Sequence, residues 1–452
     1  MMNIIFLGGT GTVTGSKYLV ETSTTKILID CGLYQGYKWL RARNREPLPF
    51  DLHELDAIVL THAHLDHSGF IPAIYKQGFR GPVFTHPATI SLCNILLVDS
   101  GHIQEDDAKF YGKHKISRHE KPEPLYDKAT AEACLSLFKP VSFDESFSIG
   151  DIEVTLQSAG HILGAASVIL NADGKRVGFS GDVGRCDDSI TFEPKPLPPL
   201  DLLLLESTYG NRLHEKSSPL TQLAEIVNST AKKGGALLIP SFAVGRTESI
   251  LHLLATLIKE EMIPRLPIYL DSPMAINVFD IYCQYSELNR LSKAQCYEMA
   301  NVASFTKTVD ESKALAELTG PHIIIAGSGM ATGGRILHHM KRLLGDFRTT
   351  ILFTGFLSGG TRGAKMIAGN DTIKIHGKWW PVKAEVKVLY GLSAHGDYQE
   401  LTQWLQSSKL YPKTKIRLVH GEPDASEAMR DHLKQQTKFD VEVASYHEIL
   451  RL

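Results

Sequence analysis

The stretch Leu60–Pro72 reads LTHAHLDHSGFIP and begins where the apolar run AIVL ends. It carries three histidines and an aspartate within a few residues, and neutral imidazole and carboxylate are standard zinc donors. A rigid strand that runs into a tight loop directs alternate side chains into one place. His62 and His64 are then expected on one side of a site. Asp66 and His67 are expected on the other side, an arrangement that suits two neighbouring metal ions.

Six further polar residues each follow an apolar, strand-like run elsewhere in the chain. Open α/β sheets place their sites beyond the carboxyl ends of their strands, so we expect these residues to converge on the mouth of one domain. A single one of them would more often be an N-cap or turn residue than a ligand, but six in one pattern favour a common site. They are Asp30, His161, Asp182, Glu206, His395 and His420.

The composition is that of an ordinary globular protein. The chain has 452 residues, 43% of them hydrophobic and 22% charged, so two domains are expected. Because the net charge is −2, any nucleic-acid partner must be met by a local basic surface. We find no signal-peptide pattern and no apolar run of the ~18 residues that a spanning helix needs, which predicts a cytoplasmic protein with no membrane association. The six cysteines form no C-x-x-C pair and are expected to be reduced.

The pattern of predicted strands and helices changes near residue 209. Residues 1–209 read as many short strands with interspersed helices, such as NIIFLGG and DLLLLEST. In residues 210–384, apolar strands such as GALLIPSF are each followed by a helical stretch, which predicts a parallel sheet with helices on its faces. Residues 385–452 would make a poor domain alone and are expected to return to the first. The sequence thus predicts a layered α/β protein with one domain inserted into another.

A glycine-rich stretch at residues 8–16, GGTGTVTGS, invites a dinucleotide-binding interpretation. Its spacing is G-x-G-x-x-x-G, and the segment that follows, KYLVET, is strand-like. Because the dinucleotide fingerprint needs a helix at that point, we expect a tight hairpin instead.

These motifs resemble those of the metallo-β-lactamase superfamily. The resemblance lies in THAHLDH with Asp30, the GH at His161 and the GD at Asp182. The later LLLLEST, GSGMATGGR, LSAHGD and VHGE are similar to the β-CASP branch, which processes nucleic acids. The likeness extends to the endonuclease subunit of the pre-mRNA 3′-end cleavage complex and its prokaryotic ribonuclease homologues. It covers essentially the whole chain and implies a metallo-β-lactamase αββα sandwich (1–209 and 385–452) with an inserted β-CASP α/β domain (210–384).

The resemblance also implies a role for each residue of the pattern. It implies two zinc ions (Zn²⁺) per chain, each held by three residues of its own and both bridged by one aspartate. It implies an aspartate that orients the loop and its histidines, and a general acid with an acidic partner. The first zinc takes His62, His64 and His161, the second Asp66, His67 and His420, and Asp182 bridges them; Asp30 is the orienting aspartate, His395 the acid and Glu206 its partner, with Asp66 also counted as catalytic.

Such a pair of ions suits hydrolysis of a phosphodiester. Two metal ions ~3.5–4 Å apart activate water at neutral pH and stabilise the charge that gathers on the phosphate. The leaving oxygen needs a proton, which His395 would donate while Glu206 keeps it cationic and aimed. The expected products carry a 5′-phosphate and a 3′-hydroxyl. The implied protein is a zinc-dependent ribonuclease of RNA processing or decay, endonucleolytic and with 5′–3′ exonuclease action left open.

The inserted domain would contact the substrate across a cleft from the metals. Its loops SFAVGRT, GSGMATGGR and GFLSGGTRG combine small residues with helix starts, and N–H groups at helix N-termini bind anions. The alternative is a purely structural role, in which these loops are only tight turns with surface arginines. The candidate phosphate or RNA contacts are Arg246, Ser328, Arg335, Arg362 and His376.

Three stretches of the chain are locally basic: KWLRARNR, KFYGKHKISRHEK and KIHGKWWPVK. Each is a candidate surface for a nucleic-acid backbone, and Trp379 and Trp380 are candidates for base stacking. Solvated charged faces and ordinary packing are the alternatives. The choice of RNA over DNA rests on resemblance alone, because RNA-directed β-CASP proteins have a histidine where His420 stands.

Two other functions stay open at this point. A small-molecule hydrolase for a thioester or lactam would share the early metal motifs, but it would not explain the large insertion or the late SAHGD. A non-catalytic RNA-binding subunit is expected to have lost metal ligands, whereas here the set is complete. The sequence leaves open whether the chain acts alone, as a homodimer or within a processing complex.

Overall fold

The structure is a computed structural model that describes residues 1–113, 123–215, 217–355, 357 and 359–452. It divides into two compact units, which are unit 1 (Met1–Leu213 with His395–Leu452) and unit 2 (His214–Ala394). Within the described ranges, no helix is long and apolar enough to cross a membrane. The basic stretch KFYGKHKISRHEK lies mostly outside the described residues.

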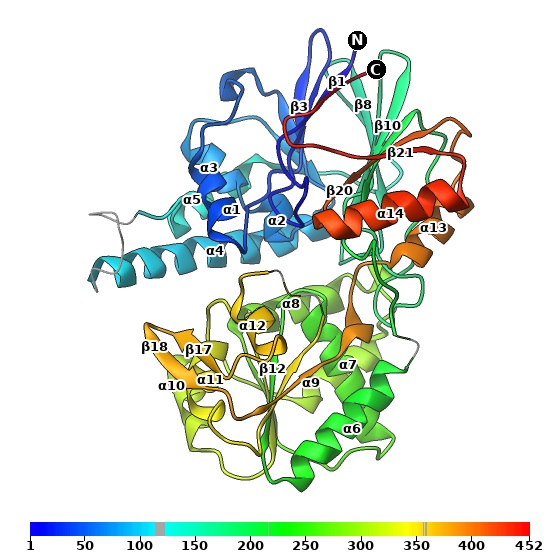
Figure 1. Ribbon diagram of the computed structural model, residues 1–452. Helices are drawn as coiled ribbons and strands as arrows, with labels where there is room; N and C mark the ends of the chain where they lie inside the picture. Colours follow the sequence, from blue (N-terminus) through cyan, green and yellow to red (C-terminus); the bar gives the residue numbers. More distant parts are fainter. Residues whose placement is uncertain (114–122, 216, 356, 358) are drawn as a thin grey trace. The chain divides into compact units, whose positions relative to one another are not determined.

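Unit 1 contains two sheets whose inner faces share one apolar core (Figure 1). In the first sheet the N-terminal strands are antiparallel, whereas β3, β4, β5 and β6 run parallel to one another. The order across this sheet is β22 (Ile449–Arg451), β1 (Asn3–Phe6), β2 (Tyr18–Glu21), β3 (Lys26–Ile29), β4 (Ala57–Val59), β5 (Val83–Thr85) and β6 (Phe138–Pro140).

The second sheet of unit 1 also mixes the two kinds of pairing. Its first strands form an antiparallel meander, and from β10 onward the neighbours are parallel. The order across it is β21 (Asp440–Val443), β20 (Lys415–Val419), β11 (Leu202–Glu206), β10 (Lys175–Phe179), β9 (Ala166–Ala172), β8 (Ile152–Ser158) and β7 (Ser146–Ile149).

Strand β11 shows why the apolar runs of this domain are continuous. Successive side chains of a strand point to opposite faces. Leu202 and Leu204 therefore enter the core between the sheets, while Leu203 and Leu205 pack under the helices on the outer face. A strand buried on both faces needs no polar alternation, which explains the sequence LLLL before Glu206.

Helices cover the outer face of each sheet of unit 1. Along α14, Ala425, Met429 and Leu433 recur every fourth residue and are buried, as expected for an amphipathic helix. Figure 1 places α2–α5 beside the first sheet and α13 and α14 beside the second, which gives the predicted αββα order of layers. The helices are α1 (Lys38–Ala42), α2 (Leu65–Ser68), α3 (Ile71–Lys76), α4 (Pro87–Lys113), α5 (Lys128–Cys134), α13 (Tyr398–Ser407) and α14 (Pro423–Gln436).

Unit 2 is built on a sheet in which every pairing between described strands is parallel, as the sequence predicts. Its apolar strands are flanked by helices, and one face is buried under α11 and α12. The strand order is β14 (Ser304–Phe305), β13 (Ile268–Asp271), β15 (His322–Ala326), β12 (Ala236–Pro240), β16 (Thr350–Phe353) and β19 (Glu385–Val388). The helices are α6 (Pro219–Lys232), α7 (Arg246–Lys259), α8 (Pro273–Gln284), α9 (Lys293–Val302), α10 (Val309–Ala314), α11 (Ile336–Leu343) and α12 (Arg362–Ile367).

Two features of unit 2 differ from simple expectation. The sequence predicted a boundary after residue 384, but β19 pairs in parallel with β16 and therefore belongs to the sheet of unit 2. An antiparallel hairpin of β17 (Thr372–Ile375) and β18 (Lys378–Pro381) lies outside that sheet. It carries Trp379, which is exposed, and Trp380, which packs against the core of the unit.

The expectation that all cysteines are reduced is wrong for one pair. Cys283 of α8 and Cys296 of α9 form a disulfide. The connection between the two helices is short, and the Cα atoms of the two cysteines are 5.9 Å apart, a separation typical of disulfides. The four remaining cysteines are free.

Unit 2 also buries an acidic side chain whose titration is linked to stability. Glu248 lies in the first turn of α7 and is fully buried. Burial, offset only in part by the N–H groups of Glu248 and Gly245, raises the pKa of its carboxyl from 4.5 to about 8. Between these two pKa values the folded chain binds more protons than the unfolded chain. The free energy of unfolding therefore falls as the pH rises through this window.

We predict that Glu248→Gln removes much of this pH dependence. Between pH 5 and 8, Glu248 should lower the free energy of unfolding of the wild type by at most about 1.4 kcal/mol for each pH unit. The glutamine variant should lack this contribution to the slope. Urea unfolding of unit 2 at several pH values measures it. Glu298→Gln, at an exposed acid of α9, is the control and should keep the wild-type slope. Equal slopes in all three proteins would contradict the prediction.

Candidate metal centre

The carboxyl ends of several strands of unit 1 meet at one edge of the sandwich. Asp30 follows β3, and the loop with His62 and His64 follows β4. Asp182 follows β10 and His420 follows β20 on the second sheet. Because these strands are parallel within each sheet, the residues after them reach the same edge. The predicted convergence of strand ends is present.

Asp182 lies at the centre of this edge and is almost fully buried. Its Oδ2 faces His62 Nε2 and His161 Nε2, each at 3.4 Å. Its Oδ1 faces His67 Nε2 at 3.2 Å and His420 Nδ1 at 3.4 Å. One carboxylate thus presents one oxygen to each of two histidine groups.

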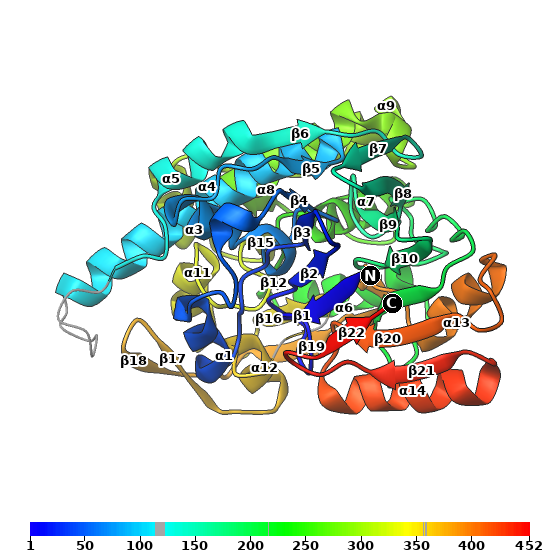
Figure 2. The same ribbon diagram turned by 90° about the horizontal axis from the view of Figure 1, so that it is seen from above.

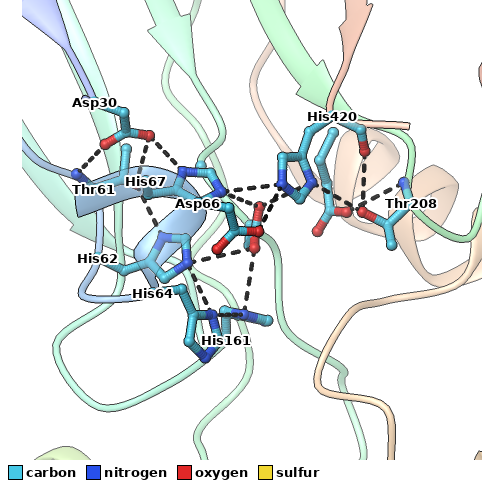
Figure 3. Close-up of polar contacts among 12 residues, drawn as sticks. Asp30, Thr61, His62, His64, Asp66, His67, His161, Thr208 and His420 are labelled. Carbon is cyan, nitrogen blue, oxygen red and sulfur yellow. Dashed lines mark hydrogen bonds and ion pairs between the residues drawn. The ribbon is translucent and has the colours of Figure 1, made fainter. Parts of the chain in front are cut away.

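The donor atoms fall into two groups with the spacing that a metal ion requires. His64 Nδ1 is 3.2 Å from both His62 Nε2 and His161 Nε2, and His67 Nε2 is 3.2 Å from His420 Nε2 (Figure 3). Two nitrogens that each lie ~2.0–2.1 Å from one tetrahedral zinc are ~3.3 Å apart, so the observed separations fit a shared ion. The first group is His62, His64, His161 and Asp182, and the second is Asp66, His67 and His420.

Hydrogen bonds behind the histidines set their orientation. Asp30 accepts from the Thr61 N–H at 2.8 Å and the Thr61 hydroxyl at 2.9 Å, and its Oδ2 is 2.6 Å from His67 Nδ1 (Figure 3). The Thr61 hydroxyl is also 3.0 Å from His62 Nδ1. Each of these imidazoles therefore has one nitrogen engaged by the protein and the other aimed at Asp182. This is the arrangement by which carboxylates orient metal-ligating histidines.

His420 is held in an unusual backbone conformation. Its φ of 49° lies in the left-handed region, which costs a residue other than glycine on the order of 1 kcal/mol or more. Its N–H donates to Gly9 O at 2.6 Å, and its carbonyl accepts from the Thr208 hydroxyl at 3.0 Å. The same hydroxyl is 3.1 Å from His420 Nδ1. These contacts fix a turn that aims the imidazole back at Asp182.

One glycine allows the metal-binding loop to approach the strand ends. A Cβ on Gly32 would lie 1.6 Å from the carbonyl oxygen of Asp66. The N–H groups of Cys31 and Leu33 donate to the carbonyls of His67 and Leu65 at 2.7 and 2.8 Å. The backbone of residues 31–33 thus packs directly against α2, where no side chain would fit.

The electrostatics of the site favour neutral imidazole nitrogens in the first group. Burial lowers the pKa of His64 to about 3 and lowers the pKa of His62 and His161. Although burial opposes it, the electrostatic influence of the neighbouring His420, His67 and His62 side chains holds the pKa of Asp182 well below its usual range. Buried neutral imidazoles beside an ionised carboxylate are the protonation states in which these groups bind metal.

The residues therefore fit a pair of metal ions. Asp182 Oδ1 is buried and makes no hydrogen bond within the described chain, although two imidazoles face it. A buried carboxylate oxygen without a donor is costly unless a cation completes its coordination. Histidine nitrogens and carboxylate oxygens in these numbers are a typical donor set for zinc.

A second polar pair adjoins the first donor group. His395 Nδ1 is 3.1 Å from both carboxylate oxygens of Glu206 and 4.0 Å from Asp182 Oδ2. Although burial alone would lower it, the carboxylates of Glu206 and Asp182 raise the pKa of His395 to about 9. Glu206 is fully buried and also accepts from the Val183 N–H at 2.6 Å. The pair is thus anchored to the residue that follows Asp182.

The candidate phosphate contacts all lie in unit 2. Arg335 donates to Asp271 Oδ1 at 2.7 Å and to the carbonyls of Thr306 and Lys307. Arg362 donates to three backbone carbonyls, those of Lys374, Ala331 and Thr332. Both guanidinium groups therefore support the loops around them, and their protein partners already occupy several of their donors.

The other candidates are arranged differently. Ser328 is half-buried, and its hydroxyl accepts from the Thr332 N–H at 3.0 Å, which closes the loop before α11. His376 is exposed at the turn between β17 and β18. Arg246 is the first residue of α7, with its guanidinium beside Gly355. Arg335, Arg362 and Ser328 thus border the loop of residues 327–335, whereas Arg246 lies at a separate helix start.

Sequence reasoning did not single out two threonines of the site. Thr61 links Asp30 to His62, and Thr208 holds His420. Each lies inside a motif that was recognised for its charged members, since Thr61 opens THAHLDH and Thr208 ends LLLLEST. A polar residue adjacent to a ligand in an otherwise apolar strand was the available signal.

Three family models match the chain in order. The Beta-lactamase superfamily domain matches residues 25–239, and the Beta-Casp domain matches residues 247–366. The Zn-dependent metallo-hydrolase RNA specificity domain matches residues 379–444. A relative from Thermus thermophilus named Ribonuclease TTHA0252 is 37% identical over 94% of both chains.

The chain belongs to the β-CASP branch of the metallo-β-lactamase superfamily. This confirms the resemblance and the fold class that the sequence predicted. Among other β-CASP relatives, an RNase J-like protein from Methanocaldococcus jannaschii is 32% identical over 93% of both chains. The transcription termination factor FttA of the same organism is 30% identical over 96% of this chain and 70% of its own. A solved protein of unknown function from Enterococcus faecalis shares the fold, with a TM-score of 0.54 and 12% identity over the full length of both chains.

We predict that Asp30→Asn weakens metal binding by about 10–100-fold while the protein still folds, because His67 loses the carboxylate that orients it. Competition with a chromophoric chelator measures the affinity, and circular dichroism checks the fold. Asp51→Asn is the control, since Asp51 only caps a surface turn through the His53 N–H. Wild-type affinity in Asp30→Asn would show that this carboxylate does not support the centre.

Proposed function

We propose that the protein is a zinc-dependent ribonuclease that hydrolyses phosphodiester bonds of RNA through a two-metal centre. The observation that carries this proposal is the pair of donor groups on the two oxygens of Asp182. The ribonuclease name of the 37% identical relative supports RNA as the substrate. The RNA specificity domain over residues 379–444 supports the same choice.

Each donor group would hold one zinc ion. Two observations support this. Neighbouring histidine nitrogens within each group are 3.2 Å apart, as expected for two ligands of one metal ion, and Asp182 turns one carboxylate oxygen to each group. Asp30 would orient His67 without touching metal, as its hydrogen bonds suggest. The first zinc would bind His62, His64 and His161, the second Asp66, His67 and His420, and both would bind Asp182.

The residues of the chain would divide the work of hydrolysis among them. When bound, the two zinc ions supply an activated water and positive charge for the phosphate. Asp66, with Oδ2 at 3.5 Å from His420 Nε2, would accept a hydrogen bond from that water and help to orient it. His395 would protonate the leaving oxygen, because Glu206 engages its Nδ1 and leaves Nε2 to donate. The products would be a 5′-phosphate and a 3′-hydroxyl.

Unit 2 would supply the contacts that hold the RNA backbone. The N–H groups at the starts of α7 and α11 and the side chains beside them are the proposed phosphate ligands. Among the proposed side chains, His376 is the most exposed. The guanidinium N–H groups of Arg335 and Arg362 that already donate to protein oxygens would have to bind a phosphate in addition to those oxygens. The proposed set is Arg246, Ser328, Arg335, Arg362 and His376.

The wider biology follows from the same proposal. We place the protein in RNA processing or decay in the cytoplasm, acting endonucleolytically and with 5′–3′ exonuclease activity open to test. A homodimer or a processing complex would be compatible with this role. Mapping the ends of products from end-labelled RNA distinguishes internal cleavage from stepwise removal of nucleotides.

Two other functions make different demands on the same centre. A thioester or lactam hydrolase would turn over those substrates rapidly and leave labelled RNA intact. A non-catalytic RNA-binding subunit would hold less than one zinc per chain, unrecovered by added zinc. Metal analysis followed by parallel assays on RNA, thioester and β-lactam substrates separates all three.

We predict that His395→Ala keeps both metal ions and its fold but cleaves RNA about 10²–10⁴-fold more slowly, because the leaving oxygen loses its proton donor. Single-turnover cleavage of labelled RNA and elemental analysis measure the two properties. His53→Ala, at an exposed histidine on the surface of unit 1, is the control and should cleave as the wild type does. A wild-type rate in His395→Ala would refute its assignment as the acid.

A further inference from the structure

We propose that Tyr37 and Trp39 form a stacking platform for unpaired bases of an RNA strand, flanked by cationic side chains that contact its phosphates. The platform lies at α1, outside the metal centre and outside the loops of unit 2 already considered. The inference deepens the proposed function by naming single-stranded RNA as the form of the substrate that the protein grips.

The aromatic pair is unusually exposed for its size. Tyr37 is 42% and Trp39 58% exposed, although large apolar side chains normally lie inside. Their rings are nearly parallel, with an interplanar angle of 18° and centroids 6.5 Å apart. Exposed rings of common orientation can offer π-faces on which nucleic-acid bases stack, whatever their sequence.

The charged side chains within the segment that carries the platform are all of one sign. The segment Tyr37–Arg45 reads YKWLRARNR and contains four cationic residues and no acidic one. In the part of the chain that the structure describes, no carboxylate pairs with any of the four. Arg41 and Lys38 are exposed, and Arg45 donates to the carbonyl of Glu123 at 2.6 Å. A polyanion is therefore the partner that matches this surface.

The platform is fixed rather than loose. The guanidinium of Arg43 lies 5.2 Å from the ring centre of Trp39 and 4.2 Å from that of Tyr446. Such cation–π contacts hold both partners in place. Leu40 of α1 is buried, and Asn44 exchanges two hydrogen bonds with the backbone of Tyr34 at 2.9 and 2.8 Å. Little conformational freedom would be lost when a base stacks here.

The same segment is tied to the metal-binding loop. Tyr34 adjoins Leu33, whose N–H donates to the carbonyl of Leu65 at 2.8 Å. Leu65 lies between His64 and Asp66, one in each donor group. The platform and the metal centre therefore share one rigid piece of unit 1, and a strand held at α1 has a defined register relative to the candidate ligands.

A second copy of the chain is a poorer match for this surface. In a two-fold symmetric contact each patch meets its own equivalent. The four cations of one copy would then face those of the other, and like charges across an interface are unfavourable. We therefore assign the surface to RNA and treat self-association as an outcome of the test.

The test compares binding of two fluorescent oligoribonucleotides of equal length by anisotropy. One carries adenine at every position, and the other is abasic with the same phosphates. His395→Ala serves as the background so that the strand survives. Trp39→Ala should weaken binding of the adenine strand about tenfold and leave the abasic strand unchanged, whereas Trp39→Phe should restore most of the affinity. Arg41→Gln should weaken both strands and lower the salt slope by about 0.7.

Tyr297→Ala removes an aromatic side chain that is 73% exposed on α9, a helix with one cationic residue, Lys293, against four in Tyr37–Arg45. This variant should bind both strands as the background does. Equal affinity of Trp39→Ala and its background for adenine RNA would overturn the platform. A dimer seen in sedimentation of the background protein, and converted to monomer only by Trp39→Ala, would also overturn the platform. The surface would then be a contact between two copies of the chain.

Failure of the platform and failure of the proposed function give different results. If the platform is right, Trp39→Ala in the otherwise wild-type protein raises KM for single-stranded RNA and leaves kcat unchanged. Trp39-dependent binding without any cleavage by the wild type would refute the nuclease and retain the platform. Cleavage of RNA with the same KM in the wild type and in Trp39→Ala would refute the platform and retain the nuclease.

Discussion

The candidate metal centre of unit 1 is organised around one buried carboxylate. Asp182 turns one oxygen to His62 and His161 and the other to His67 and His420, so residues from both sheets of the sandwich meet on it. Cations shared between these nitrogens would offset the cost of burying four imidazoles and a carboxylate so close together. The hydrogen bonds of Asp30, Thr61 and Thr208 are explained by the same constraint, because they fix the imidazoles from behind.

Much of the fold could be predicted because the apolar pattern reports burial directly. The LLLL run of β11 belongs to a strand covered on both faces, and the strand–helix alternation of unit 2 produced a parallel sheet. The place of β19 could not be read in this way. Its residues follow a hairpin and precede the motif of His395, and only pairing with β16 assigns them to unit 2. The disulfide of Cys283 likewise depends on how two helices pack, which spacing alone does not encode.

The predicted donor side chains of the candidate site lie together in the structure, whereas their surroundings were less predictable. Histidine and aspartate at strand ends carry their chemistry in their identity, and the structure brings that whole set together. An arginine does not reveal its partner from sequence. Arg335 and Arg362 followed glycine-rich loops as phosphate ligands do, yet their guanidinium groups bond to Asp271 and to backbone carbonyls. Thr61 and Thr208 were missed because a hydroxyl becomes part of a site only through geometry.

The most direct test of the two-metal account is anomalous diffraction at the zinc absorption edge from crystals grown with zinc. The account predicts two peaks, one on each side of the Asp182 carboxylate. The first should lie ~2.0–2.2 Å from donors of His62, His64 and His161, and the second at the same distance from donors of Asp66, His67 and His420. A single peak, or histidines that turn away from Asp182 with no peak between them, would contradict it.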